Sequence, residues 1–131
     1  MRFFVSGSAP LFAKTHEAFT ARTGNRILER YGLTETNMII SNPYDGARRT
    51  GTVGFALAGT EVRLTKRETG ELVTAGEIGM IEVRGSNVFR GYWRMPGKTA
   101  EELRENRFSS LTTLGRSARK AIFPSLAAKR I

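Results

Sequence analysis

The first third of the chain has the pattern of a strand, a turn, a helix and a second strand, and this order constrains the fold more than any other feature. Residues 2–6 form a short apolar run rich in strand-forming residues, and residues 7–10 interrupt it with small residues and a proline. Residues 10–23 carry apolar side chains near helical spacing, with a proline at the first helical position and a glycine directly after the last turn. Residues 26–31 predict a second strand that ends at Gly32. A strand-helix-strand unit builds a parallel sheet, so the sequence predicts an α/β fold.

The rest of the chain predicts antiparallel strands after this unit. Residues 41–59 contain four glycines and a proline, which predicts a loop with one short strand near residues 52–55. Residues 61–65 and 80–84 alternate polar and apolar side chains, as expected for antiparallel strands. Residues 99–104 follow a proline and predict a short helix.

Length and composition limit the class of protein. The chain has 131 residues, which fits one small domain or a piece of a larger one. It contains no cysteine, which excludes disulfides and thiolate metal sites and favours a reducing compartment. It has no long apolar run and no signal-peptide pattern, so we expect no membrane span. These features predict a cytoplasmic protein.

The formal charge of +9 comes mainly from the end of the chain. Residues 1–103 carry a net charge of +3, whereas residues 104–131 carry +6. The basic end matches no nucleic-acid-binding motif and has few aromatic residues, so we expect no nucleic-acid partner. From residue 107 onward no period is sustained, and we expect no well-packed element and weak protection from amide exchange.

Two segments have residues suited to binding a phosphate-bearing ligand. Residues 6–10 form a small-residue turn between a strand and a helix, where backbone amides can approach an anion; the alternative is that small residues serve only the turn. In the second segment, Thr34, Glu35 and Thr36 follow a predicted strand and offer oxygen ligands of the kind that magnesium-bound polyphosphate requires. The alternative there is a threonine cap on a short helix, with Glu35 facing solvent.

Two further features favour structural roles. Residues 76–93 contain an alternating strand bracketed by glycines that continues to an aromatic pair, a pattern typical of core packing. The one histidine, His16, lies on the predicted helix, where we expect it at the surface.

Taken in order, these segments resemble the adenylate-forming, AMP-dependent acyl-CoA synthetases, with the malonyl-CoA synthetases as the nearest branch. The segment Tyr31-Gly-Leu-Thr-Glu-Thr36 is the most specific, and the resemblance is nearly continuous over residues 1–108. The matching stretches are residues 6–11, 29–37, 41–46, 51–54, 76–79 and 83–93.

The resemblance implies a reaction and a set of site residues. Enzymes of this family join a carboxylic acid to ATP, release pyrophosphate, and let the sulfur of coenzyme A attack the acyl-adenylate. It implies ATP, Mg²⁺ and coenzyme A as cofactors, and malonate or a similar small carboxylate as substrate. Thr34 and Glu35 would be the catalytic hydroxyl and carboxylate near the phosphates, with Glu35 holding the metal. The residues that would contact the nucleotide or the acyl pocket are Gly7, Ser8, Ala9, Pro10, Glu29, Arg30, Tyr31, Gly32 and Thr34.

The resemblance also predicts that parts of the enzyme are missing. The family's phosphate loop, its Thr-Gly-Asp segment and its lysine-bearing C-terminal domain have no counterpart here. We therefore expect residues 1–108 to be a partial AMP-binding domain, a fragment of the large N-terminal domain, and the chain to be inactive alone. One alternative is an active ligase whose remainder is on another segment. Another is a non-catalytic basic binding module.

Residues 109–131 are predicted to be an aberrant basic tail translated out of frame. One codon choice for residues 120–131, read from its third base, translates as GYISIVGREKD. That string resembles the family's segment after its ribose-binding aspartate. A frameshift near residues 108–112 would account for it.

Overall fold

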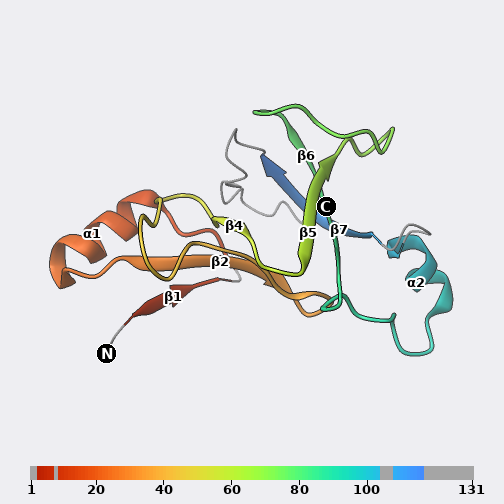
Figure 1. Ribbon diagram of the computed structural model, residues 1–131, viewed down its shortest axis with the longest axis horizontal. Coiled ribbons are helices and arrows are strands. Elements are labelled where there is room, and N and C mark those ends of the chain that lie inside the picture. Colours follow the sequence, from red (N-terminus) through yellow and green to blue (C-terminus); the bar gives the residue numbers. More distant parts are fainter. Residues whose placement is uncertain (1–2, 8, 104–107, 117–131) are drawn as a thin grey trace.

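The protein forms two β-sheets with one helix at each end of the molecule (Figure 1). This computed structural model describes residues 3–7, 9–103 and 108–116. The mixed α/β architecture agrees with the sequence prediction. Within the described residues, no helix is both long and apolar enough to cross a membrane.

The first sheet has the strand order β1-β2-β3-β4. β1 (Phe4–Ser6) pairs in parallel with β2 (Ile27–Leu33), and α1 (Ala13–Thr23) connects them. The ring of Phe19 on α1 packs edge-on against that of Phe4, with centroids 4.8 Å apart. The predicted strand-helix-strand unit is therefore confirmed.

Two boundaries of this unit differ from the prediction, and one agrees with it. α1 begins at Ala13 rather than at Pro10, because Phe12 has an extended backbone conformation and no side chain caps the helix. It ends as predicted at Gly24, whose φ of 70° is the left-handed conformation that glycine adopts readily. β2 does not end at Gly32 but continues to Leu33.

A strand that the sequence pattern did not reveal follows β2. β3 (Asn37–Ser41) runs antiparallel to β2, and β4 (Phe55–Ala56) pairs with its other edge. Ile39 and Ile40 are both fully buried although successive side chains of a strand point to opposite faces. Since both faces of β3 are covered, its sequence lacks the polar-apolar alternation that would have marked it as a strand.

The second sheet is antiparallel throughout. Its order is β5 (Thr60–Thr65), β6 (Ile78–Gly85) and β7 (Ser109–Arg116). The alternation over residues 61–65 and 80–84 thus predicted β5 and β6 correctly. The helix α2 (Pro96–Glu102) covers part of the predicted 99–104, but residues 87–93 form an irregular connection rather than an extension of β6.

β7 corrects the expectation that no packed element follows residue 107. It lies along β6 in antiparallel register, from Ile78 opposite Arg116 to Val83 opposite Ser109. Strand pairing uses backbone N–H and C=O groups, which any residue except proline supplies, so a sequence without periodicity can still form a strand. The rest of the predicted basic tail, residues 117–131, lies outside the described residues.

The two sheets share one apolar core. It combines Ile39 and Ile40 of β3 with Leu64 of β5 and with Ile81 and Val83 of β6. Next to this core, a partly buried ion pair joins Arg63 to Glu82, with 2.7 Å between Nη2 and Oε2. The sheets are therefore parts of a single packed unit.

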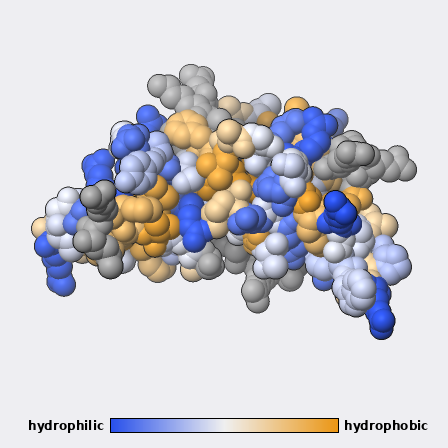
Figure 2. Space-filling model, turned by 60° about the horizontal axis from the view of Figure 1, so that its bottom comes forward, coloured by the Kyte–Doolittle hydropathy of each residue, from blue (hydrophilic) through white to orange (hydrophobic). Residues whose placement is uncertain are grey.

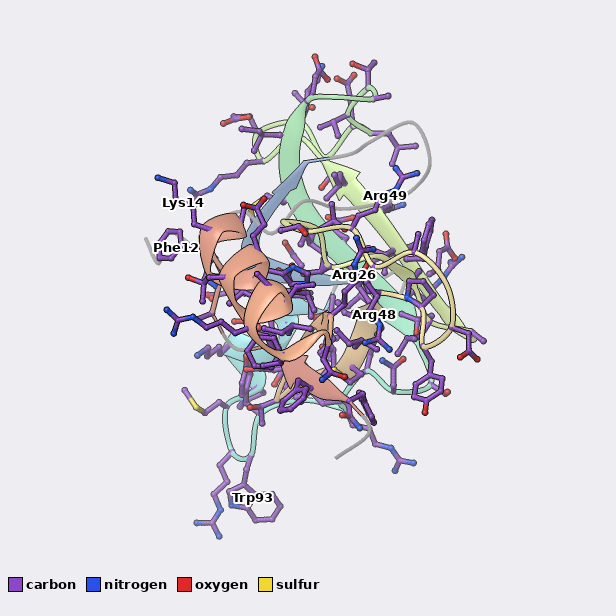
Figure 3. The ribbon with its side chains drawn as sticks, turned by 90° about the vertical axis from the view of Figure 1, so that its left-hand side faces the viewer. Phe12, Lys14, Arg26, Arg48, Arg49 and Trp93 are labelled. Atoms are coloured by element: carbon purple, nitrogen blue, oxygen red, sulfur yellow. The ribbon has the colours of Figure 1, made fainter. Side chains whose placement is uncertain are left out.

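Large apolar side chains also lie on the surface. Figure 2 shows them in several patches separated by hydrophilic residues. Phe12 is 77% exposed and Trp93 is 84% exposed. In Figure 3, Trp93 projects away from both sheets, and Phe12 extends from the beginning of α1 beside Lys14. Isolated exposed apolar residues of this kind are common on protein surfaces.

Candidate functional site

The motif at residues 31–36 forms a tight hairpin between β2 and β3. Thr36 closes the turn, because its backbone N–H donates to Leu33 O at 3.2 Å and its hydroxyl accepts from Leu33 N at 3.3 Å. Gly32 is required there, since a Cβ atom at this position would lie 2.0 Å from Asn37 O. The hairpin exposes Thr34 and leaves Glu35 half-buried. Thr34 and Thr36 thus lie in a strand-to-strand turn rather than at a helix cap.

Residues of the connection after β6 form hydrogen bonds with this hairpin turn. Asn87 Nδ2 donates to Thr36 O at 2.6 Å, and Phe89 N donates to Glu35 O at 2.7 Å. Tyr92 adds a hydrogen bond to the side chain, with its hydroxyl 3.1 Å from Glu35 Oε1. One residue of the segment predicted to pack the core, Tyr92, therefore contacts the predicted metal-binding carboxylate, and two others contact the backbone of the turn.

Tyr92 also contacts a second carboxylate. Its hydroxyl lies 2.7 Å from Oε2 of Glu102, at the end of α2. Burial raises the pKa of Tyr92, and the hydrogen bonds to Glu102 and Glu35 raise it further. Tyr92 therefore keeps its proton at neutral pH and can donate a hydrogen bond to either carboxylate.

The small-residue turn after β1 lies at the same end of the sheet. Because Ser6 pairs with Glu29, the following Gly7 lies beside Arg30, and a Cβ atom on it would be 3.5 Å from Arg30 O. Ala9 and Pro10 are exposed, and Ser8 lies outside the described residues. The carboxyl ends of adjacent parallel strands are where open α/β sheets bind ligands, so this turn and the Thr34–Glu35 hairpin share a suitable edge.

Two of the predicted pocket residues on β2, Arg30 and Tyr31, contact other side chains of the protein. The guanidinium of Arg30 contacts the sulfur of Met38, with 2.6 Å between Nη1 and Sδ. Tyr31 packs against the shared core.

Glu29 is buried and contacts the loop between β3 and β4. It is 3% exposed, and its Oε1 accepts a hydrogen bond from the backbone N–H of Gly51 at 3.1 Å. Burial raises the pKa of Glu29, while the Gly51 N–H and the neighbouring His16 act in the opposite direction. Its carboxylate is therefore committed to the loop between β3 and β4.

His16 is buried, which corrects the expectation of a surface position. It is 3% exposed, with Nε2 3.2 Å from Ile27 O and Nδ1 3.1 Å from the Thr50 hydroxyl. Since a carbonyl oxygen only accepts, Nε2 carries a proton and donates it to Ile27 O. His16 thus ties α1 to β2 and to the loop that Glu29 holds.

Arg48 has a similar structural role at the base of this loop. Its Nη1 donates to Arg26 O at 2.7 Å and its Nη2 to Tyr44 O at 2.8 Å. Figure 3 shows Arg26, Arg48 and Arg49 together beside α1. Because its donors are used by backbone carbonyls, Arg48 is poorly placed to bind a substrate carboxylate.

The site residues fit a magnesium-bound polyphosphate. Carboxylate oxygens are ligands that Mg²⁺ prefers, and it commonly binds through one or two carboxylates plus the phosphates of the ligand. Glu35 and Glu102 present two such groups around Tyr92. Among the described residues, no three His, Cys, Asp or Glu side chains gather as a metal cage.

Thr34 and Glu35 were predicted from a local motif, whereas their neighbours Asn87, Tyr92 and Glu102 were not predicted as site residues. In the sequence, Asn87 lies 51 positions from Thr36, and Tyr92 lies 57 positions from Glu35. The one available signal was the aromatic pair after Gly91, and its pattern is equally typical of a core.

Comparisons with known proteins agree on one family. Residues 1–93 match the family described as AMP-binding enzyme. A malonate–CoA ligase from Arabidopsis thaliana is 37% identical over 116 residues, which cover 88% of this chain and 18% of the relative.

Solved structures give the same result. MatB from Rhodopseudomonas palustris with ATP bound has a TM-score of 0.93 and 53% identity, over 98% of this chain and 25% of that one. A malonyl-CoA ligase in a ternary product complex with methylmalonyl-CoA and AMP has a TM-score of 0.87 and 37% identity, over 99% of this chain and 28% of that one. The chain therefore spans between 18% and 28% of the length of these proteins.

Proposed function

We propose, since this chain belongs to the family of AMP-binding enzymes, that it supplies part of the nucleotide site of an AMP-forming acyl-CoA ligase. The observation that carries the proposal is the hairpin turn in which Thr34 is exposed and the carboxylate of Glu35 is held by Tyr92. Glu35 would hold Mg²⁺ beside the phosphates of ATP, and the exposed hydroxyl of Thr34 would donate to a phosphate oxygen.

The reaction proposed for the complete enzyme has two steps. A carboxylate oxygen attacks the α-phosphorus of ATP, and pyrophosphate leaves to give an acyl-adenylate. The sulfur of coenzyme A then attacks the acyl carbon, loses its proton, and AMP leaves. A bound magnesium ion would neutralise phosphate charge and so favour the first attack. The chain would contribute positioning and electrostatic stabilisation to that step.

Malonate is the acid that we propose for the complete enzyme. The names of the similar ligases support it, and the identity of 53% to MatB extends over nearly the whole chain. A cytoplasmic location remains our prediction for the protein.

The chain alone is proposed to be inactive, because it spans a quarter of the length of MatB. Purified chain with malonate, ATP and Mg²⁺ should release no pyrophosphate above background. Release by the chain alone would contradict the proposal of an incomplete site. Release only after addition of a separately produced upstream segment would favour a ligase divided between polypeptides.

Binding tests the nucleotide site directly. Calorimetric titration of the chain with ATP should show tighter binding in Mg²⁺ than in EDTA, and Glu35→Gln should remove this difference. Glu68→Gln is the matched control, since Glu68 lies exposed in the turn after β5. A metal-binding role for Glu35 would be contradicted if both variants lost the Mg²⁺ dependence of ATP binding equally, or if Glu35→Gln kept it.

A further inference from the structure

The hydroxyl of Tyr92 lies between two carboxylates that come from different parts of the chain. Glu35 Oε1 is 3.1 Å away, and Glu102 Oε2 is 2.7 Å away. A phenol hydroxyl has a single hydrogen, so Tyr92 donates a full hydrogen bond to one of these oxygens at a time. Hydrogen bonds to a charged acceptor are stronger than those between neutral groups, which makes this contact well suited to fixing a carboxylate.

Tyr92 is held in place by groups other than Glu35. Its backbone N–H donates to the Thr99 hydroxyl at 2.9 Å, and its ring packs edge-on against Phe89 with centroids 4.7 Å apart. Lys98 Nζ lies 4.6 Å from the ring centroid. Gly91 permits this approach, because a Cβ atom there would lie 2.6 Å from Thr99 Cγ2. The hydroxyl is therefore presented to Glu35 by a prearranged scaffold.

The backbone of the turn is fixed separately from this side-chain contact. Phe89 N donates to Glu35 O, and Asn87 Nδ2 donates to Thr36 O. These bonds set the path of the chain at Glu35 but leave its side-chain torsions undetermined. The hydrogen bond from Tyr92 is the interaction that selects one orientation of the carboxylate.

We propose that Tyr92 is a positioning residue that orients the Glu35 carboxylate toward the cation of a bound nucleotide, an inference that rests on the proposed function. Glu102 provides a second acceptor, so the hydroxyl hydrogen can turn to Glu102 when a cation occupies the Glu35 oxygen. A ligand group whose orientation is set before binding loses less conformational freedom on binding.

The first test needs no ligand. In the full chain labelled with ¹³C at glutamate carboxyl carbons, the Glu35 resonance is assigned by its loss in Glu35→Gln. Tyr92→Phe removes only the hydroxyl and should shift the Glu35 resonance, while the amide resonances of Thr36 and Phe89 stay in place. Tyr44→Phe is the matched control, because Tyr44 is 59% exposed, and should shift nothing at Glu35. An unchanged Glu35 resonance in Tyr92→Phe would overturn the proposal.

Glu102→Gln gives an independent variant with the opposite expectation. A neutral carboxamide competes less well for the hydroxyl hydrogen, so Tyr92 should donate more fully to Glu35. The Glu35 carboxyl resonance should then move in the direction opposite to its shift in Tyr92→Phe. A shift in the same direction in both variants would contradict the sharing of this hydrogen.

The second test uses Mg²⁺ and ATP. Tyr92→Phe should weaken ATP binding in Mg²⁺ by about three- to tenfold, the effect of one lost hydrogen bond, and leave binding in EDTA unchanged. In the Glu35→Gln background, Tyr92→Phe should have no further effect. Equal weakening with and without Mg²⁺ would indicate a purely structural role and overturn the proposal. If Glu35→Gln itself changes nothing, the proposed function fails, while the carboxyl resonance still decides whether Tyr92 positions Glu35.

Discussion

The Oε1 atom of Glu29 lies 3.1 Å from the backbone nitrogen of Gly51 and accepts its hydrogen bond inside the protein. Asn42 supports the same loop, because its Nδ2 donates to Thr52 O at 2.6 Å and its backbone N–H to Glu29 O at 3.0 Å. The loop between β3 and β4 is thus attached to β2 by buried polar groups. This arrangement makes Glu29 a structural residue whose removal should affect stability.

Glu29→Ala should lower the free energy of unfolding by about 1–3 kcal/mol, because it leaves the Gly51 N–H without its acceptor in a partly buried position. Glu29→Gln keeps an acceptor oxygen and should cost less. Urea unfolding followed by circular dichroism measures both. Equal stability of wild type and Glu29→Ala would show that the Gly51 N–H has another acceptor.

The pH dependence of stability should report the raised pKa of Glu29. Burial raises this pKa above its ordinary value of 4.5, so the folded protein binds this proton more tightly than the unfolded chain does. The stabilisation of the folded state by the protonated Glu29 is fully present below pH 4.5. It is lost as the pH rises through the folded-state pKa of Glu29. The stability of Glu29→Gln relative to wild type should therefore increase as the pH rises through this window and stay constant above it. A constant difference between the two across this range would contradict a raised pKa.

Gly32→Ala should destabilise the hairpin by roughly 1–3 kcal/mol or more, because the added Cβ atom would meet Asn37 O and force the strands apart. Gly97→Ala is the matched control. Its added methyl group meets no atom within 4 Å and should stabilise α2 slightly, since alanine favours helix over glycine. Thermal unfolding compares the two variants. Similar changes in stability in Gly32→Ala and Gly97→Ala would contradict the claim that the close approach of β2 and β3 requires a glycine at position 32.

Amide exchange should distinguish β7 from the chain around it. Amides of Ser109–Arg116 that pair with β6 should be protected, and those on the outer edge of β7 should exchange quickly. This outcome replaces the expectation of weak protection from residue 107 onward. Uniformly fast exchange over Ser109–Arg116 would contradict the pairing with β6.

The frameshift proposed for residues 109–131 is tested by the encoding DNA. We expect a coding sequence whose shifted frame reads GYISIVGREKD near its end. Codons that cannot be read in this way would exclude the frameshift. Formation of β7 is compatible with either result, because its pairing depends on backbone groups.

Local patterns predicted the parts of the fold that depend on neighbouring residues. The glycine at position 24 and the alternation in β5 and β6 are short-range signals, and these elements lie close to their predicted positions. β3 was missed because both of its faces are buried, and β7 because its sequence has no alternation. The predicted site behaved similarly: Thr34 and Glu35 follow from a local motif, whereas their contact with Tyr92 depends on how the two sheets meet.

The core shared by β3, β5 and β6 has a consequence for how the chain folds. Each sheet covers apolar side chains of the other in this core. The loop over residues 57–59, which joins the two sheets, is therefore a poor place to divide the protein. Most of the pairings in this core join residues distant in sequence, which favours slow folding with a late, cooperative step. A chain cut at this loop should yield two pieces that acquire ordered structure only when mixed.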